Sequence, residues 1–142
     1  MSMTRHLAPL LSLCLALGCG SPIALTESFH LGEPFWLEIG TTGHSEEGTT
    51  TVRYERVASD SRCPGGDIVC IWAGEVTVEV SVATILMGEV QVQLHQVLEP
   101  RAVTLEEQGR RVELLAYEDA PGDWPARTHK RSRIQLLVTA VP

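Results

Sequence analysis

The clearest pattern in this chain is a strict alternation of apolar and polar residues near its middle. Positions 76–82 carry Val at every second residue, and positions 90–95 repeat the pattern with Val and Leu against Gln and His. A period of two with β-branched residues is typical of half-buried strands. Residues 84–89, which include Gly88, separate the two runs. The sequence therefore predicts a central antiparallel hairpin whose Val faces point inward.

Shorter runs of the same kind predict further strands at 28–31, 35–39, 52–57, 112–114 and 134–139. No window shows a sustained helical stripe, because the nearest candidate, 105–115, contains Gly109 and alternates at its end. Short strands separated by turns, without β–α alternation, indicate one all-β domain. We expect an antiparallel β-sandwich or small barrel of about seven or eight strands, and the pattern fits either architecture.

The N-terminal residues have the composition of an export signal. Arg5 precedes an apolar run at 7–17 that contains Pro9 and ends at Gly18-Cys19. This run is too short to span a bilayer, which favours a signal that is removed over a transmembrane helix.

The last four residues of this segment, Ala16-Leu17-Gly18-Cys19, resemble a bacterial lipobox. The resemblance implies a lipoprotein signal peptide at 1–18, a lipidated Cys19 with a tether through residue 26, and an all-β domain at 27–142. It also implies a lipid-anchored protein of the bacterial cell envelope, and Gly20 after the Cys favours the outer membrane, facing the periplasm or the exterior. The alternatives are an ordinary secretory signal or a Cys19 that pairs with another thiol.

The charge of the chain narrows the class of partner. The formal net charge is −7, with acidic residues scattered along the chain, which argues against nucleic acid and is typical of a solvated surface. One basic stretch, 127–133, is a solvated loop or a patch for anionic lipid.

The segment 60–75 contains the remaining thiols. Cys63 and Cys70 are left once Cys14 departs with the signal and Cys19 is lipidated, and an exported protein meets an oxidising compartment. We therefore expect a Cys63–Cys70 disulfide, with Pro64 and its following Gly pair forming the turn. The spacing is not Cys-x-x-Cys, which disfavours a redox role.

Five residues of this segment form a candidate interaction loop: Asp60, Arg62, Asp67, Trp72 and Glu75. We expect Arg62 to pair with Asp60 or Glu75, and Trp72 to pack beside the disulfide. The three acidic side chains offer oxygen atoms to calcium, although no EF-hand spacing is present. Zinc or copper lacks a ligand set because the His residues are dispersed, so no metal site and no cofactor are expected.

Residues 60–64, Asp-Ser-Arg-Cys-Pro, and 70–75, Cys-Ile-Trp-Ala-Gly-Glu, together resemble the signature of a family of small, uncharacterised bacterial lipoproteins and secreted proteins. The resemblance implies an all-β fold and supports the disulfide. It implies no activity, because none is established for that family.

Catalytic patterns are absent from the sequence. There is no Gly-x-Ser-x-Gly elbow, and Ser61 beside Asp60 fits a turn better than a relay. The leading hypothesis is a non-catalytic, membrane-anchored lipoprotein that contacts another envelope protein through the stapled loop. The alternative is a small-ligand or calcium-binding module centred on the same acidic loop.

Overall fold

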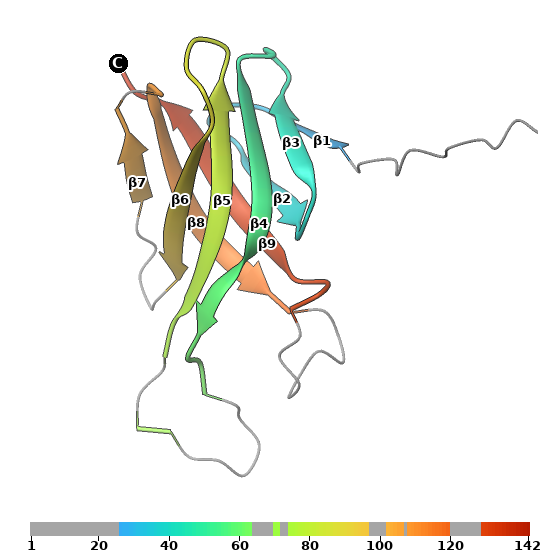
Figure 1. Ribbon diagram of the computed structural model, residues 1–142, viewed down its shortest axis with the longest axis vertical. Helices are drawn as coiled ribbons and strands as arrows, with labels where there is room; N and C mark the ends of the chain where they lie inside the picture. The colour runs from blue at the N-terminus through green and yellow to red at the C-terminus, as the bar shows by residue number, and fades with distance from the viewer. Residues whose placement is uncertain (1–25, 64–69, 72–73, 97–101, 107, 120–128) are drawn as a thin grey trace, which may run out of the picture.

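The protein is a two-layered, all-β domain (Figure 1). A computed structural model describes residues 26–63, 70–71, 74–96, 102–106, 108–119 and 129–142. Over these residues it contains nine strands and no helix, which confirms the predicted fold class. The two sheets form a sandwich, and the strand number exceeds the expected seven or eight by at least one.

The first sheet is formed by five strands. Three of its four neighbouring strand pairs are antiparallel. In the fourth pair, at one edge of the sheet, the first strand of the chain runs parallel to the third. In spatial order the strands are β1 (Thr26–Phe29), β3 (Thr42–Ser45), β4 (Thr50–Asp60), β5 (Val76–Thr84) and β6 (Val90–Gln96).

The second sheet is antiparallel throughout and covers one face of the first. Its strand β8 contains a register irregularity between Leu114 and Ala116. The alternation of inward-facing and outward-facing residues therefore shifts at this point of the strand. In spatial order its strands are β2 (Pro34–Glu38), β9 (Arg133–Ala140), β8 (Arg110–Glu118) and β7 (Ala102–Leu105).

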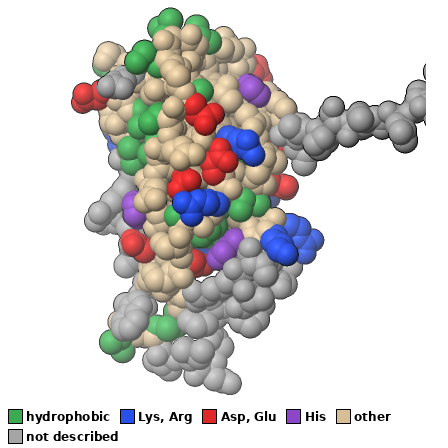
Figure 2. Space-filling model, viewed as in Figure 1, with side chains coloured by type: hydrophobic (Ala, Val, Ile, Leu, Met, Phe, Trp, Pro, Cys, Tyr) green, Lys and Arg blue, Asp and Glu red, His purple; other side chains and the backbone are tan. Residues whose placement is uncertain are grey.

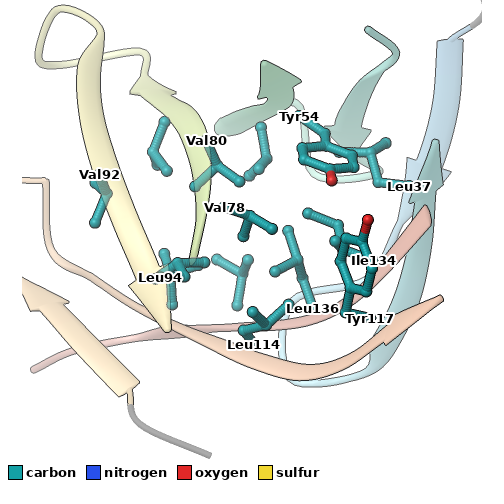
Figure 3. Close-up of a cluster of buried hydrophobic side chains, with 14 of the residues drawn as sticks. Leu37, Tyr54, Val78, Val80, Val92, Leu94, Leu114, Tyr117, Ile134 and Leu136 are labelled. Carbon is teal, nitrogen blue, oxygen red and sulfur yellow. The ribbon is translucent and has the colours of Figure 1, made fainter. Parts of the chain in front are cut away.

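The core lies between the sheets and is built from the alternating residues of both (Figure 3). Val78 and Val80 of β5 face Leu136 of β9 and Leu114 of β8 across the sandwich, and all four side chains are fully buried. Burial of apolar surface is the main favourable term in folding, so this layer supplies most of the stability of the domain.

Two predictions about the hairpin need correction. β6 pairs only with β5, so the β5–β6 hairpin lies at the edge of its sheet and not at the centre. Two residues of the polar face of β5, Thr77 and Ser81, are also buried, and they bond to His95 of β6 and Glu55 of β4. The inward direction of the Val residues is confirmed.

The domain has two ends that differ in chemistry. At the loop end, β4 leads into the disulfide segment and β5 leaves it, while β8 finishes and β9 begins nearby. At the hairpin end lie the β5–β6 turn (85–89), the β3–β4 turn (46–49) and the β7–β8 turn (106–109) (Figure 1).

Candidate functional site

The predicted disulfide is present at the loop end. Cys63 and Cys70 are bonded, with their Cα atoms 5.8 Å apart, and they close a short loop whose residues 64–69 lie outside the described part of the chain. A covalent ring of this size reduces the conformational freedom of the unfolded chain by about 2.5 kcal/mol in the entropic account.

Hydrogen bonds between Ser61 and Glu75 form a second link between the two ends of the disulfide segment. The Ser61 amide donates to the Glu75 carbonyl at 2.8 Å, and the Glu75 amide donates to the Ser61 hydroxyl at 3.0 Å. Gly74 lies against this stem with a positive φ of 71°, and a Cβ there would be 2.2 Å from the Ser61 carbonyl oxygen. Only glycine fits this backbone approach, so the two strands of the stem are held together at this point.

Arg62 organises the third closure. Its guanidinium binds both carboxylate oxygens of Asp60, at 2.9 and 2.7 Å, and it also donates to Asp119 at 2.7 Å. The Asp60 side chain is only 2 % exposed. Because Asp119 follows β8 of the second sheet, this planar fork ties the end of β4 to the opposite layer.

Tyr117 and His129 complete this arrangement, which we call the Arg62 network (Asp60, Arg62, Tyr117, Asp119 and His129). The Tyr117 hydroxyl donates to Asp119 at 2.7 Å, and His129 Nδ1 lies 2.7 Å from that hydroxyl. The Arg62 guanidinium lies 4.5 Å from the centre of the Tyr117 ring, in cation–π geometry. His129 has a positive φ of 51°, an uncommon conformation for a residue other than glycine.

The environment of the network shifts its ionisation. Burial and the hydrogen bond to Asp119 raise the pKa of Tyr117. Burial would raise the pKa of Asp119, but the hydrogen bonds from Tyr117 and Arg62 and the charge of Arg62 lower it below its ordinary value. The bond to Asp60 raises the pKa of Arg62 despite partial burial. The ion pair is therefore charged at neutral pH.

Tyr54 extends the network into the core. Figure 3 shows Tyr54 and Tyr117 pointing their hydroxyl groups toward one another from opposite sheets. The Tyr54 hydroxyl bonds to Ser132 at 2.9 Å, and Ser132 donates to the His129 carbonyl at 3.1 Å. Burial raises the pKa of Tyr54 to about 12, an effect that the bond to Ser132 partly opposes. These hydrogen bonds link Tyr54 of the core to the segment just before β9.

The structure brings together only part of the predicted interaction loop. Asp60 and Arg62 pair as expected, and Arg62 also bonds to Asp119. The backbone of Glu75 bonds to Ser61. Asp67 and Trp72 lie outside the described residues, as does Cys19.

Sequence reasoning missed Tyr117, Asp119 and His129. These residues come from the end of β8 and the segment before β9, far from the Cys-containing segment in the chain. No local motif joins them, and the only available signal is the concentration of polar residues at 117–119 after an apolar strand.

The Arg62 network links the end of β4 to the end of β8. Both oxygens of Asp60 accept from Arg62, and among the described residues no group of three or more His, Cys, Asp or Glu side chains could hold a metal ion. The Ser61 hydroxyl bonds to the Glu75 backbone. The network fixes the end of β4, where the chain enters the disulfide segment.

Comparisons with known proteins found no match among protein-family models, curated proteins or solved structures.

Proposed function

We propose that this protein is a membrane-anchored bacterial lipoprotein that acts without catalysis and presents its disulfide-stapled loop to another protein of the cell envelope. The anchor is the lipidated Cys19 implied by the lipobox resemblance, and the outer membrane is the favoured location. Over the described residues, no helix is long and apolar enough to cross a membrane.

One observation carries the interaction role. The side chain of Ile71, directly after Cys70, is 89 % exposed. The chain next to it is held by the disulfide, by the Ser61–Glu75 hydrogen bonds and by the Arg62 network. A large apolar side chain on a rigid base loses little conformational entropy when it binds, which is the property of a preorganised contact site.

The calcium alternative predicts a different state of the same residues. Asp60 would have to exchange Arg62 for an ion, and this exchange would remove a charge-assisted pair from a buried position. A melting temperature measured with calcium and with chelator tests it, and we expect the two values to coincide.

Photocrosslinking in living cells tests the proposed contact. A photoreactive benzophenone amino acid replaces Ile71 in the full chain, and the matched control carries it at Gln93, which is exposed on β6. We expect a discrete protein adduct from position 71 that is absent from position 93 and is lost when Cys63 and Cys70 are replaced by Ser. An adduct that survives loss of the disulfide, or none at all, contradicts the loop as a contact site.

The anchor is tested separately by metabolic labelling with a fatty acid. Wild-type protein should incorporate the label and partition with membranes, whereas Cys19→Ser should do neither. Equal labelling of both chains contradicts the lipoprotein assignment but leaves the photocrosslinking result independent.

A further inference from the structure

Over the described residues, the two sheets of the sandwich have four edge strands, and these differ in how well they resist pairing. An edge strand offers unpaired backbone N–H and C=O groups to any other chain, so proteins commonly shorten, charge or interrupt their edges. β1 and β7 have four residues each, and β2 starts with Pro34 and ends with Glu38. β6 has seven residues and contains no Asp, Glu, Lys, Arg or Pro. Among the four edges, β6 therefore lacks the features that block pairing.

The backbone of β6 is regular along its whole length. It pairs with β5 from Val90 to Gln96 without a register shift, whereas the β4–β5 and β8–β9 ladders both contain irregularities. Among the described residues, no strand other than β5 pairs with β6. The outer edge of β6 thus presents a row of backbone donors and acceptors in the geometry that another strand would meet.

The gap between the two sheets is closed on one side of the sandwich and open on the other. On the β1–β2 side, the rings of Phe29 and Phe35 stack with their centres 4.0 Å apart. On the opposite side β6 lies next to β7 (Figure 1), and a groove of about 350 Å³ there has Val90 and Leu105 in its lining. Figure 2 shows hydrophobic side chains at the surface on this side of the molecule. A chain that pairs with β6 would cover part of this apolar surface.

The side chains of β6 are self-complementary about Gln93. In a two-fold antiparallel pair centred on that residue, residue 92 of one copy lies opposite residue 94 of the other, and 91 lies opposite 95. The buried Val92 then meets the buried Leu94, and Gln91 meets His95 on the polar face. Cross-strand pairs of matching polarity are the favourable combinations. A second copy of this chain therefore offers β6 a matching residue on both faces of the sheet.

Charge around the edge favours the antiparallel arrangement. Glu89, directly before β6, and Glu106, in the lining of the groove, both lie at the hairpin end. An in-register parallel pair would place Glu89 of one copy beside Glu89 of the other, and like charges opposite one another are unfavourable. In the antiparallel pair these two carboxylates lie on opposite sides of the centre, separated by roughly 26 Å along the strand. This exceeds the Debye length of about 8 Å at physiological salt, so their repulsion is screened.

We propose that β6 pairs antiparallel with β6 of a second copy of this chain, centred on Gln93, and joins two five-stranded sheets into one continuous sheet. The two-fold axis is normal to the sheet, so the β7 strands of the two copies face one another in the second layer. A contact of this kind is small for a protein interface, and we expect a dimer that dissociates on dilution. The dimer depends neither on the lipid at Cys19 nor on the disulfide segment.

Disulfide crosslinking of the full chain, purified in detergent, tests both the pairing and its register. Gln93→Cys places two thiols at the two-fold axis, where opposite Cα atoms are about 4.5–5.5 Å apart and within the range of a disulfide. Gln91→Cys is the matched control, because Gln91 is exposed on the same face but lies about 13 Å along the strand from its own copy. After mild oxidation we expect at least about tenfold more covalent dimer from Gln93→Cys than from Gln91→Cys. Peptide mapping of the dimer should find a link between the two copies of residue 93.

Sedimentation equilibrium of the chain without added thiols tests the native dimer. Gln93→Lys places two like charges at the axis and should weaken dimerisation about fivefold, whereas Gln91→Lys should change it much less. Both native side chains are exposed, so the circular dichroism spectra should match that of the wild type.

Three results would overturn the proposal. The first is equal covalent yields from Gln93→Cys and Gln91→Cys, and the second is a wild-type chain that stays monomeric at every concentration. The third is a link from residue 93 to a different protein, which would make β6 the docking site of another chain. A photocrosslink from position 93 in cells supports the pairing only if the adduct has twice the mass of the chain, and that mass distinguishes it from an adduct of position 71 with another envelope protein.

Discussion

Among substitutions of partly exposed residues at the loop end, Arg62→Met should lower the free energy of unfolding the most. The substitution keeps the volume of the side chain but removes the guanidinium that satisfies Asp60, which is 2 % exposed, and Asp119, which is 19 % exposed. Removing one partner of a buried ion pair costs 3–5 kcal/mol, because the other charge is left uncompensated. Since Arg62 itself is 29 % exposed, water reaches the edge of the site, and we expect a loss of about 3 kcal/mol.

A double-mutant cycle isolates the interaction. Asp60→Asn alone keeps a hydrogen-bond acceptor and removes the charge, so we expect a loss of about 1–2 kcal/mol. The Asp60→Asn, Arg62→Met double variant should be more stable than the sum of the single losses by about 1–2 kcal/mol. Urea denaturation with the disulfide intact, followed by circular dichroism, measures all three. Arg53→Met is the matched control, because Arg53 is half-exposed and lies 3.5 Å from Glu55, and its loss should stay within about 0.5 kcal/mol.

Acid provides an independent measurement of the same pair. The pKa of Asp119 is lowered in the folded state, so its contribution is present above the unfolded pKa near 3.8 and is lost as the pH falls through the folded value. Stability should therefore decline below about pH 4, and Arg62→Met should reduce that decline. If Arg62→Met costs no more than Arg53→Met, Arg62 does not stabilise the fold. If the single losses simply add, Arg62 and Asp60 do not stabilise it as a pair.

Three further changes test the remaining closures. Cys63→Ser with Cys70→Ser should lower the unfolding free energy by about 2–4 kcal/mol in denaturant melts without changing the fold, and free thiols in protein from an oxidising compartment would contradict the bond. Gly48→Ala should lower the unfolding free energy by about 1 kcal/mol, and Gly74→Ala should lower it by more than twice as much. Both glycines have a positive φ, but only a Cβ at position 74 would meet backbone atoms within 4 Å. Equal losses would refute the stem contact. Burial raises the Tyr54 pKa from 10 to about 12, so stability should fall as the pH rises from 10 to 12, and Tyr54→Phe should reduce this alkaline loss when melts are compared.

The strands that the sequence predicts well are those with an apolar residue at every second position. β5 and β9 belong to this class, because their inward residues face the opposite sheet along most of their length. β3, Thr42–Ser45, has no such pattern and was not predicted. It pairs with β1 and β4, and Gly43 leaves room for the Phe29 ring of β1, since a Cβ there would lie 3.2 Å from the ring.

The candidate site was only half predictable for a related reason. The disulfide and the Asp60–Arg62 pair lie within a few residues of each other, so composition and local chain geometry indicate them. Asp119 reaches Arg62 across 57 positions, and Tyr117 turns inward only after the irregularity in β8. An alternation rule applied to β8 assigns Tyr117 the wrong phase, because the rule assumes an uninterrupted register.

The position of the Arg62 network between the two sheets suggests why it consists of charged residues, although apolar side chains would also fill the space. An apolar replacement for a buried pair is often as stable, so stability alone does not require Arg62. Its planar fork, however, bonds to Asp60 at the end of β4 and to Asp119 just after β8, which belong to different layers of the sandwich. The geometry thereby fixes the direction of β4 where the stapled loop leaves it. Replacing Asp60, Arg62 and Asp119 together by apolar residues should then keep the melting temperature close to wild type while weakening the photocrosslink from position 71. If that crosslink persists at full yield, the orientation of the loop does not depend on the charged fork.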